Sequence, residues 1–406
     1  MRYLIFGYGV TGKSVAKYLS LKNEDYYVYD DNQSNLKDIG NEKLFVESKI
    51  SEVDEVIISP GIAPSHELLQ KLITKKIPIK TDIDIFGINY QGKVIGVTGT
   101  NGKTTFVNEL TNFLNLNKLT SIAVGNVGVS PLDILADNYD YVILELSSYQ
   151  LHYTTKLNLD IAIILNLFPD HIDWHDSFDN YVNSKLKILT FLEEKKQARK
   201  IIGSNTGVIE KNLPNNTTMS AQNNTSVHKE LLLSLGQASK LIGGEELYNS
   251  FVKYIEDNII KYPHRMECFL HIENKNLVFF NDSKATNYHA VSEATKLINV
   301  ENKDCILILH GITKETPENK LNIDPIVKYI VIPKDMNVNL GTHNAEIIYI
   351  DCIFNLKDTL FNLLNENQII LFSCAGSSFN DFKDYQARGD YFKKTILSMD
   401  IEDAKY

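Results

Sequence analysis

The chain has 406 residues, with 41 lysine and arginine residues against 51 aspartate and glutamate residues, so its net charge is −10. This length suggests roughly two to three domains of about 150 residues each, and the acidic balance argues against a general binder of nucleic acid or membrane surfaces. The four cysteines are widely spaced and form no CxxC pair, which indicates reduced thiols rather than a disulfide framework or a zinc site. Because no leader-like segment or membrane-spanning apolar run is visible, we expect a soluble cytoplasmic protein.

The first region, residues 1–90, alternates strand and helix patterns. "RYLIFG" predicts a strand that runs into the glycine turn "GYGVTG" and then an amphipathic helix. "YYVYDD" predicts a second strand ending at Asp30 and Asp31, and "EVIISPGI" predicts a third. The turn has the G-x-G-x-x-G spacing of a dinucleotide-binding loop. NAD binding and a purely structural turn both remain open for this motif.

The second region, residues 91–262, predicts a parallel sheet covered on both faces. Its apolar, β-branched runs are "KVIGVTGT", "TSIAVGNVG", "YVILELSS" and "DIAIILNL", with helical or loop sequence between them. The stretch 205–224 is rich in Asn and Thr and predicts a surface loop. The helical patterns "KELLLSLGQASKLIG" and "EELYNSFVKYIEDNI" end the region.

The stretch "GVTGTNGKTT", residues 96–105, has the order strand, glycine loop, helix that is typical of a P-loop. Glycines let backbone N–H groups approach phosphate oxygens, and a helix N-terminus favours an anion. Lys103 is expected at the β- and γ-phosphates of ATP, and the Thr104 hydroxyl at a magnesium ion. An ordinary turn with a surface lysine is the alternative. The residues expected to bind ATP here are Gly99, Thr100, Asn101, Gly102, Lys103, Thr104 and Thr105.

Two more polar side chains follow strands of this region, Glu145 in "YVILELSS" and His171 in "NLFPDHIDWH". Magnesium prefers several hard oxygen ligands, and ligands of such sheets bind at the carboxyl ends of the strands. We therefore expect both residues beside the phosphate-binding loop. Taken singly, Glu145 also fits an acid that caps a helix, and His171 also fits a buried core histidine.

The third region, residues 263–406, again has an α/β pattern. Its strand patterns are "NLVFFNDS", "CILILHG", "KYIVIPK", "EIIYID" and "QIILFSC". In "NDSKATN", the side chains of Asp282, Lys284 and Thr286 would share one side if the segment were extended. By composition alone, capped turns explain this motif, "HRME" and "CAGSSFNDFKDYQARGDYF" better than a binding site does. The whole chain thus predicts three α/β domains, Rossmann-like at both ends around a central P-loop ATPase-type parallel sheet.

These motifs occur in the order found in the Mur ligases, and the chain resembles that family over all three regions. The stretches that carry the resemblance are "GVTGTNGKTT", "VGNVG", "LELSSYQL", "DHIDWHDSFDNYVNSKLKIL", "HRME", "NDSKATN" and "CAGSSFNDFKDYQARGDYF". Mur ligases are ATP-dependent amino-acid ligases of peptidoglycan precursor synthesis. The resemblance implies that ATP phosphorylates the carboxylate of UDP-N-acetylmuramoyl-L-alanine (UDP-MurNAc-L-Ala), and that the amine of D-glutamate attacks the acyl phosphate.

The resemblance also implies roles for single residues. The catalytic residues would be Lys103, His171 and Lys185, with Lys185 carbamylated. The ligands of two magnesium ions would be Thr104, Glu145, His171 and Lys185. Further ATP contacts would come from Arg265 and Asp282. The uridine-diphosphate and muramoyl contacts would be Val10, Thr11, Asp30, Asp31, Gly61 and Asn126. The D-glutamate contacts would be Lys284, Thr286, Lys314, Ser378 and Tyr385.

Two alternatives remain open from the sequence. The chain could be another Mur-type ligase that adds a different amino acid, or a P-loop switch that binds nucleotide without ligating anything. By composition alone, Lys185 fits a solvated helix lysine, so its role depends on the resemblance. We expect small-molecule substrates only, no nucleic-acid or membrane partner, and a monomer.

Overall fold

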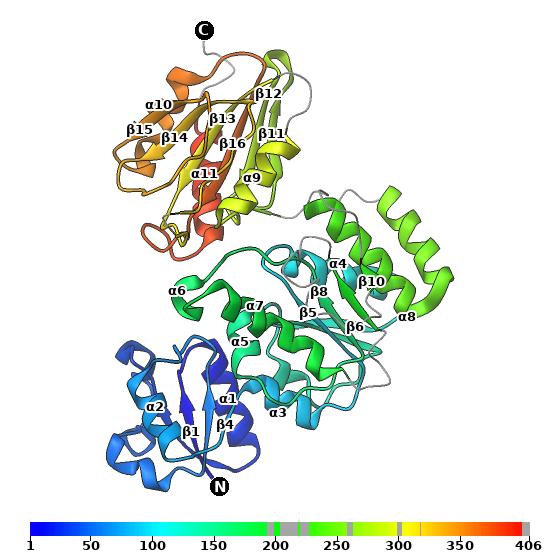
Figure 1. The fold of residues 1–406 in the computed structure, drawn as a ribbon, viewed down its shortest axis with the longest axis vertical. Helices are drawn as coiled ribbons and strands as arrows, with labels where there is room; N and C mark the ends of the chain where they lie inside the picture. The colour runs from blue at the N-terminus through cyan, green and yellow to red at the C-terminus, as the bar shows by residue number, and fades with distance from the viewer. Residues whose placement is uncertain are drawn as a thin grey trace. The chain divides into compact units, whose positions relative to one another are not determined.

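The structure is a computed structural model that describes residues 1–192, 199–203, 218–219, 227–257, 263–298, 303–316 and 318–399. It divides into two compact units, Met1–Leu167 with Ser177–Tyr254, and Phe168–Asp176 with Ile255–Tyr406. Three separate sheets, each with helices packed beside it, make up these units (Figure 1). The α/β fold expected from the sequence is therefore confirmed. The domain boundaries at residues 90 and 262 stay predictions.

The N-terminal sheet is parallel, with the strand order β2-β1-β3-β4. Its elements are β1 (Arg2–Phe6), α1 (Val10–Leu21), β2 (Asp25–Tyr29), β3 (Glu55–Ile58), α2 (Glu67–Thr74) and β4 (Ile79–Lys80). The predicted glycine turn joins β1 to α1. A Cβ atom on Gly12 would lie 2.0 Å from the carbonyl oxygen of Gly7, so the turn requires glycine there whatever it binds.

The central sheet is parallel throughout, with the order β10-β9-β8-β5-β7-β6. Its strands are β5 (Val94–Thr98), β6 (Ser121–Gly125), β7 (Tyr141–Glu145), β8 (Ile161–Ile164), β9 (Lys200–Ile202) and β10 (Thr218–Met219). The helices before, between and after these strands are α3 (Asp82–Asn89), α4 (Lys103–Leu116), α5 (Ser148–Tyr153), α6 (Ile172–His175), α7 (Phe178–Leu186) and α8 (Val227–Asp257). The four predicted strands of this region are β5 to β8.

The two helical patterns that end the second region form one element, α8, which is kinked at Gly243 and Gly244. The surface loop predicted at 205–224 lies outside the described residues, except for the two residues of β10.

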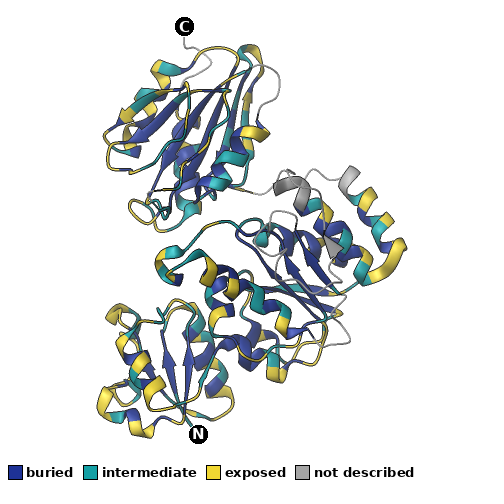
Figure 2. Ribbon diagram, viewed as in Figure 1, coloured by how far each residue is buried: buried dark blue, intermediate teal, exposed yellow. Residues whose placement is uncertain are grey.

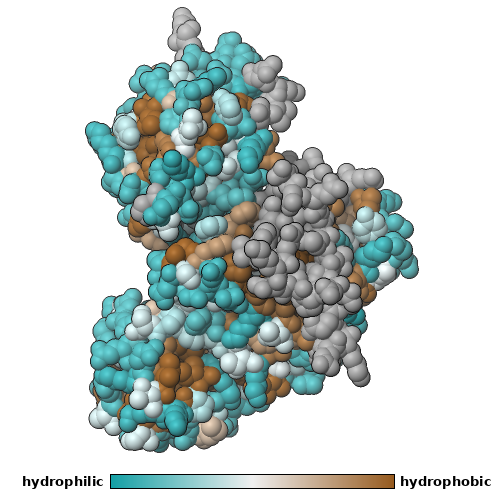
Figure 3. Space-filling view, in the orientation of Figure 1, coloured by the Kyte–Doolittle hydropathy of each residue, from teal (hydrophilic) through white to brown (hydrophobic). Residues whose placement is uncertain are grey.

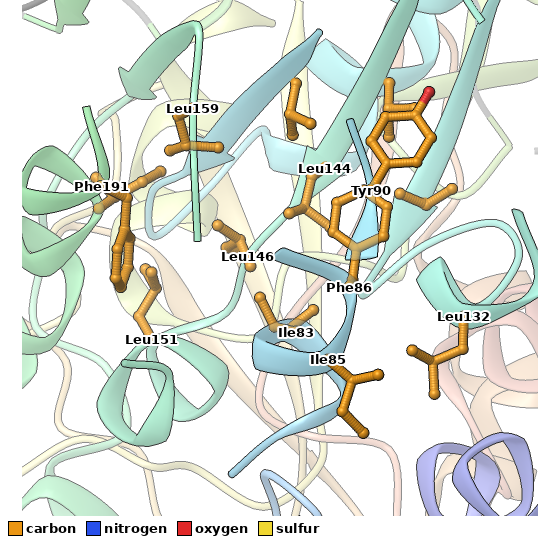
Figure 4. Close-up of a cluster of buried hydrophobic side chains, with 14 of the residues drawn as sticks. Ile83, Ile85, Phe86, Tyr90, Leu132, Leu144, Leu146, Leu151, Leu159 and Phe191 are labelled. Atoms are coloured by element: carbon orange, nitrogen blue, oxygen red, sulfur yellow. The ribbon is translucent and has the colours of Figure 1, made fainter. Parts of the chain in front are cut away.

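The inner strands of the sheets are mostly buried and the outer faces of the helices are exposed (Figure 2). In the first unit, one hydrophobic cluster reaches from Ile5 and Val28 of the N-terminal sheet to the central sheet. Figure 4 shows its middle, where Ile83 and Phe86 of α3 lie among leucines that include Leu144. Helix α3 follows the N-terminal sheet in the chain, so its packing here anchors that sheet to the central one.

Replacing Asp84 with alanine should destabilise the first unit. The carboxylate is fully buried and accepts five hydrogen bonds, from N–H and Oγ1 of Thr81, N–H and Oγ1 of Thr155 and N–H of Lys156, at 2.5 to 3.1 Å. Leaving buried donors without an acceptor costs about 1–3 kcal/mol each when they cannot be rehydrated. We expect the thermal midpoint of the variant, measured by circular dichroism, to fall by at least about 5 °C.

The matched control is Asp133→Ala, which removes the exposed ion pair with Lys17 in the same unit. Exposed pairs contribute only about 0–1 kcal/mol, so the midpoint of this control should stay within about 2 °C of wild type. Equal thermal midpoints for the Asp84 and Asp133 variants would contradict the stabilising role of the buried Asp84 carboxylate.

The C-terminal sheet has the order β11-β12-β16-β13-β14-β15. Its elements are β11 (Glu267–Ile272), β12 (Leu277–Asp282), α9 (Tyr288–Leu297), β13 (Asp304–His310), β14 (Val327–Pro333), β15 (Glu346–Ile350), α10 (Leu356–Leu363), β16 (Gln368–Ala375) and α11 (Tyr385–Leu397). The five predicted strands run parallel, and β11, which the sequence did not predict, pairs antiparallel with β12. Alternate residues of β13 belong to two different apolar clusters, as in a sheet covered on both faces.

All four cysteines are free, as the sequence predicts. Among the described residues, no helix is long and apolar enough to cross a membrane.

The described surface on the face shown in Figure 3 is mostly hydrophilic, with scattered apolar patches.

Candidate functional site

The predicted P-loop joins β5, an inner strand of the central sheet, to α4. Gly99 and Gly102 have φ angles of +155° and +82°, and the left-handed value at Gly102 is one that residues with a Cβ rarely adopt. Gly102 is the N-cap of α4 and has no side chain to cap the helix. The first turn of α4 therefore presents backbone N–H groups and the positive end of the helix dipole, an arrangement that suits phosphate.

Two lysines meet at the carbonyl oxygen of Gly99. The Nζ atom of Lys103 donates to it at 2.7 Å, and the Nζ atom of Lys185 donates to it at 2.8 Å. Lys185 lies in α7 and is only 2% exposed, with Nζ 4.8 Å from the centre of the Tyr181 ring. Lys185 is thus a buried residue at the phosphate-binding loop, so the reading of a solvated helix lysine is wrong.

Asn166, which the sequence analysis did not select, holds the same loop. It follows β8 and is almost fully buried. Its backbone oxygen accepts from the N–H of Thr100 at 3.0 Å, and its side chain exchanges two hydrogen bonds with the backbone of Asn101, at 2.8 and 3.1 Å. These two loop N–H groups therefore bond to Asn166. The sequence feature that could have identified Asn166 is a single amide side chain directly after an apolar strand, in "ILNLF".

Glu145 ends β7, as predicted, and is 1% exposed. Its Oε1 atom accepts a hydrogen bond from Nδ2 of Asn126 at 3.0 Å, and its Oε2 atom is buried without a hydrogen-bond partner among the described residues. Burying an unsatisfied carboxylate oxygen is unfavourable, and a bound cation would satisfy it. The half-buried Thr104 lies on the first turn of α4, which follows the neighbouring strand β5.

Within the described part of the chain, no group of three or more His, Cys, Asp or Glu residues could hold a metal ion. A magnesium ion at Glu145 would therefore take further oxygens from a hydroxyl, from water or from a substrate phosphate, as magnesium commonly does.

His171 belongs to the second compact unit, with the segment Phe168–Asp176. Its φ angle is +54°, and its Nε2 atom lies 3.5 Å from Oδ2 of Asp170. The predicted position of His171 beside the P-loop stays a prediction.

In the N-terminal sheet, Asp30 holds the glycine turn itself. Its carboxylate accepts hydrogen bonds from the N–H of Tyr8 at 2.5 Å, the N–H of Asn32 at 2.8 Å and Nδ2 of Asn35 at 3.1 Å. The neighbouring Asp31 is more exposed and lies 3.1 Å from Nε2 of His66. The other predicted contacts here are half-buried or exposed, at the start of α1 and after β3: Val10, Thr11 and Gly61.

In the C-terminal sheet, Asp282 is buried at the end of β12. Its carboxylate accepts hydrogen bonds from Oγ of Ser373 at 2.8 Å and from the N–H of Met266 at 3.1 Å. Burial raises the pKa of Asp282 to about 7, and these bonds and the charge of Arg265 oppose the rise. The N–H of Ala285 donates to the carbonyl of Asp282. The segment after Asp282 is therefore a turn, and the alternation expected for an extended "NDSKATN" does not apply.

The other predicted residues of this unit lie after strand ends of the same sheet. Lys284 follows β12, and its Nζ atom is 4.1 Å from the centre of the Tyr385 ring at the start of α11. Thr286, in the turn after Asp282, is half-buried. Lys314 and Ser378 lie on the loops after β13 and β16, which are neighbouring strands.

The chain is similar to known ligases. Residues 97–251 match the family model of the Mur ligase middle domain, and residues 1–81 match that of the Mur ligase MurD-like N-terminal domain. The UDP-N-acetylmuramoylalanine--D-glutamate ligase of Thermosipho africanus is 31% identical, over 98% of this chain and 99% of the relative. The ligase of the same name from Rickettsia prowazekii is 30% identical, over 96% of each chain.

Solved structures show the same fold at low sequence identity. A pseudomurein peptide ligase type C from Methanothermus fervidus has a TM-score of 0.55 at 15% identity, covering 98% of this chain and 99% of its own. The MurF ligase of Thermotoga maritima, solved with ADP, has a TM-score of 0.54 at 14% identity, covering 97% of this chain and 93% of its own.

Proposed function

Because the chain belongs to the Mur ligase family, we propose that it joins D-glutamate to UDP-MurNAc-L-Ala in an ATP-dependent step of peptidoglycan precursor synthesis. The observation that carries the proposal is a glycine loop with Lys103 after β5, next to the strand β7 that ends in the buried Glu145, in a chain that is similar over 98% of its length to a ligase named for D-glutamate. Another Mur-type ligase with a different amino acid is the alternative within the family.

The chemistry requires activation of a carboxylate, which is a poor electrophile. Transfer of the γ-phosphoryl group of ATP to this carboxylate provides a leaving group, and the amine of the amino acid then displaces phosphate. The N–H groups at the start of α4 and the Lys103 ammonium would hold the phosphates and stabilise charge on the transferring group. The other residues that we propose for ATP are Gly99, Thr100, Asn101, Gly102, Thr104, Thr105, Arg265 and Asp282.

Glu145 and Thr104 fit a magnesium ion. The buried Oε2 atom of Glu145, which has no hydrogen-bond partner among the described residues, is a hard anionic oxygen, and the Thr104 hydroxyl follows the neighbouring strand β5. Magnesium bound there would neutralise negative charge on the ATP phosphates. We propose that Lys185 is carbamylated and, with His171, serves a second ion. A supporting observation is that the Lys185 and Lys103 ammonium groups bind one carbonyl oxygen, and a carbamate would replace like charges with opposite ones.

The two organic substrates are assigned mainly to residues of the N-terminal and C-terminal sheets, with Asn126 after β6 of the central sheet. For the UDP-sugar we propose Val10, Thr11, Asp30, Asp31, Gly61 and Asn126. For D-glutamate we propose Lys284, Thr286, Lys314, Ser378 and Tyr385. Asp30 would act mainly by shaping the glycine turn, since its carboxylate accepts hydrogen bonds from that turn and from residues just after β2. We also propose that the protein acts as a monomer in the cytoplasm.

Phosphate release from ATP tests the function. Release should require both UDP-MurNAc-L-Ala and D-glutamate, and L-glutamate or D-aspartate should support a rate at least about tenfold lower, because one lost polar contact costs about 1–3 kcal/mol. A chain that uses L-lysine or a diamino acid equally well would be a different Mur-type ligase. Release that depends on neither small molecule would indicate a nucleotide switch.

A further inference from the structure

Two neighbouring loops of the C-terminal sheet carry residues that we propose for D-glutamate. The loop after β13 carries Lys314, and the loop after β16 carries Ser378. The N–H of Ile312 donates to the oxygen of Ser377 at 3.0 Å, and the N–H of Ser377 donates back at 2.8 Å. A Cβ atom on Gly311, whose φ is +114°, would lie 2.1 Å from the Ser377 oxygen. The two loops are therefore in tight backbone contact.

A buried histidine joins the same loops by its side chain. His310, the last residue of β13, is 1% exposed, and its Nε2 atom lies 2.9 Å from Oδ2 of Asp381 in the second loop. The N–H of Asp381 donates to the oxygen of Ser378 at 3.3 Å, so Asp381 belongs to the turn that begins at Ser378. The His310–Asp381 contact thus connects the end of a buried strand to the Ser378 turn.

Asp381 and Arg388 together favour one tautomer of the His310 imidazole. Its fully buried guanidinium donates from Nη1 to the oxygens of His310 at 3.0 Å and Gly376 at 2.9 Å, and Nη1 lies 3.4 Å from Nδ1 of His310. A carboxylate only accepts and a guanidinium only donates, so both neighbours favour the tautomer in which Nε2 carries the hydrogen and Nδ1 does not. Burial lowers the pKa of His310; Asp381 opposes this, Arg388 adds to it, and the charge of Asp335 also opposes it. The net lowering of the His310 pKa favours the neutral imidazole at neutral pH.

We propose that His310 and Asp381 are a positioning pair that sets the separation of Lys314 and Ser378, and thereby the affinity for the incoming amino acid. The inference rests on the proposed function, which assigns D-glutamate to these loops. A ligand that is bound by a cation on one loop and a hydroxyl on the other is sensitive to small changes in their separation. The pair acts without touching the substrate, through the two loops that it joins.

Steady-state kinetics of two variants test the pair. His310→Leu removes the donor and Asp381→Ala removes the acceptor, so each should raise the KM for D-glutamate about tenfold and leave kcat and the KM for ATP within about twofold. His310→Gln keeps an N–H donor near the position of Nε2 and should stay within about threefold of wild type. Asp351→Ala, which removes an exposed ion pair with Lys334 in the same sheet, is the matched control and should match wild type.

Two further measurements do not depend on turnover. Imidazole nitrogen NMR should show His310 as the Nε2–H tautomer, with His310→Gln providing the assignment. Amide hydrogen exchange at Ile312 and Ser377 should accelerate in His310→Leu and not in His310→Gln.

The outcomes separate this inference from the proposed function. A wild-type chain whose ATP hydrolysis ignores D-glutamate would overturn the proposed function and the substrate named here. A wild-type chain that depends on D-glutamate, with an unchanged KM in His310→Leu, would overturn the positioning pair alone. An equal rise in the KM for ATP would also overturn it, because the contact would then only support the fold.

Discussion

Replacing Lys103 with alanine should lower the ligation rate by at least about 10²-fold while the protein stays folded. Lys103 begins α4, and its Nζ atom donates to the carbonyl oxygens of Gly99 and Thr100. A cation held at a phosphate-binding loop stabilises charge that develops on the transferring phosphoryl group. Its removal takes away this stabilisation without opening a cavity in an apolar core. Product formation and the thermal midpoint should be measured on the same preparation.

The control for Lys103 is Lys253→Ala, which removes an exposed lysine from α8 in the same unit. This variant should ligate at the wild-type rate. If a folded Lys103→Ala protein turned over at a rate close to that of Lys253→Ala, the assignment of the loop to ATP would be wrong.

The elements were predictable from the sequence because their apolar patterns are strong. The runs that become β5 to β8 are short, β-branched and bounded by turns, and such runs indicate buried parallel strands. β11 escaped prediction because its pattern is mixed: the strand lies at the edge of its sheet, and of its six residues only Ile272 is buried. Edge strand β15 is equally exposed and was predicted, because its run EIIYI has three β-branched residues, whereas ECFLHI of β11 has one.

The site was partly predictable, for a different reason. The glycines of the P-loop and Glu145 at the end of a strand follow from local geometry, which the sequence contains. The hydrogen bonds of Asn166 to the loop join residues 65 positions apart in the sequence. The hydrogen bond of the buried Lys185 to Gly99 joins residues 86 positions apart. No local pattern reports contacts of this kind. Only the resemblance to a family singled out Lys185, as a carbamylated metal ligand. The structure shows the residue buried and hydrogen-bonded to the loop, and the carbamate stays a proposal.

Replacing Lys185 with alanine should nearly abolish activity, and a small carboxylic acid should restore part of it. As an ammonium, Lys185 lies with Lys103 at the Gly99 carbonyl oxygen. As a carbamate it would carry a negative charge and two oxygens, which magnesium prefers. Acetate or formate could occupy the space vacated in Lys185→Ala and supply the missing anion. Activity should be measured with and without added acid, and wild-type activity should fall when bicarbonate is stripped from the buffer.

Lys185→Arg separates a carbamate from a simple cation, because arginine keeps the positive charge and does not form a carbamate. If the carbamate is required, both variants should be nearly inactive, and acid should rescue only Lys185→Ala, since the arginine side chain fills the space. If Lys185 acts as a cation at the Gly99 oxygen, Lys185→Arg should retain much of the rate and acid should rescue neither variant. A Lys185→Ala enzyme that keeps most of its activity would exclude both roles. The remaining explanation for the burial of Lys185 would then be its hydrogen bond to the loop and its packing over Tyr181.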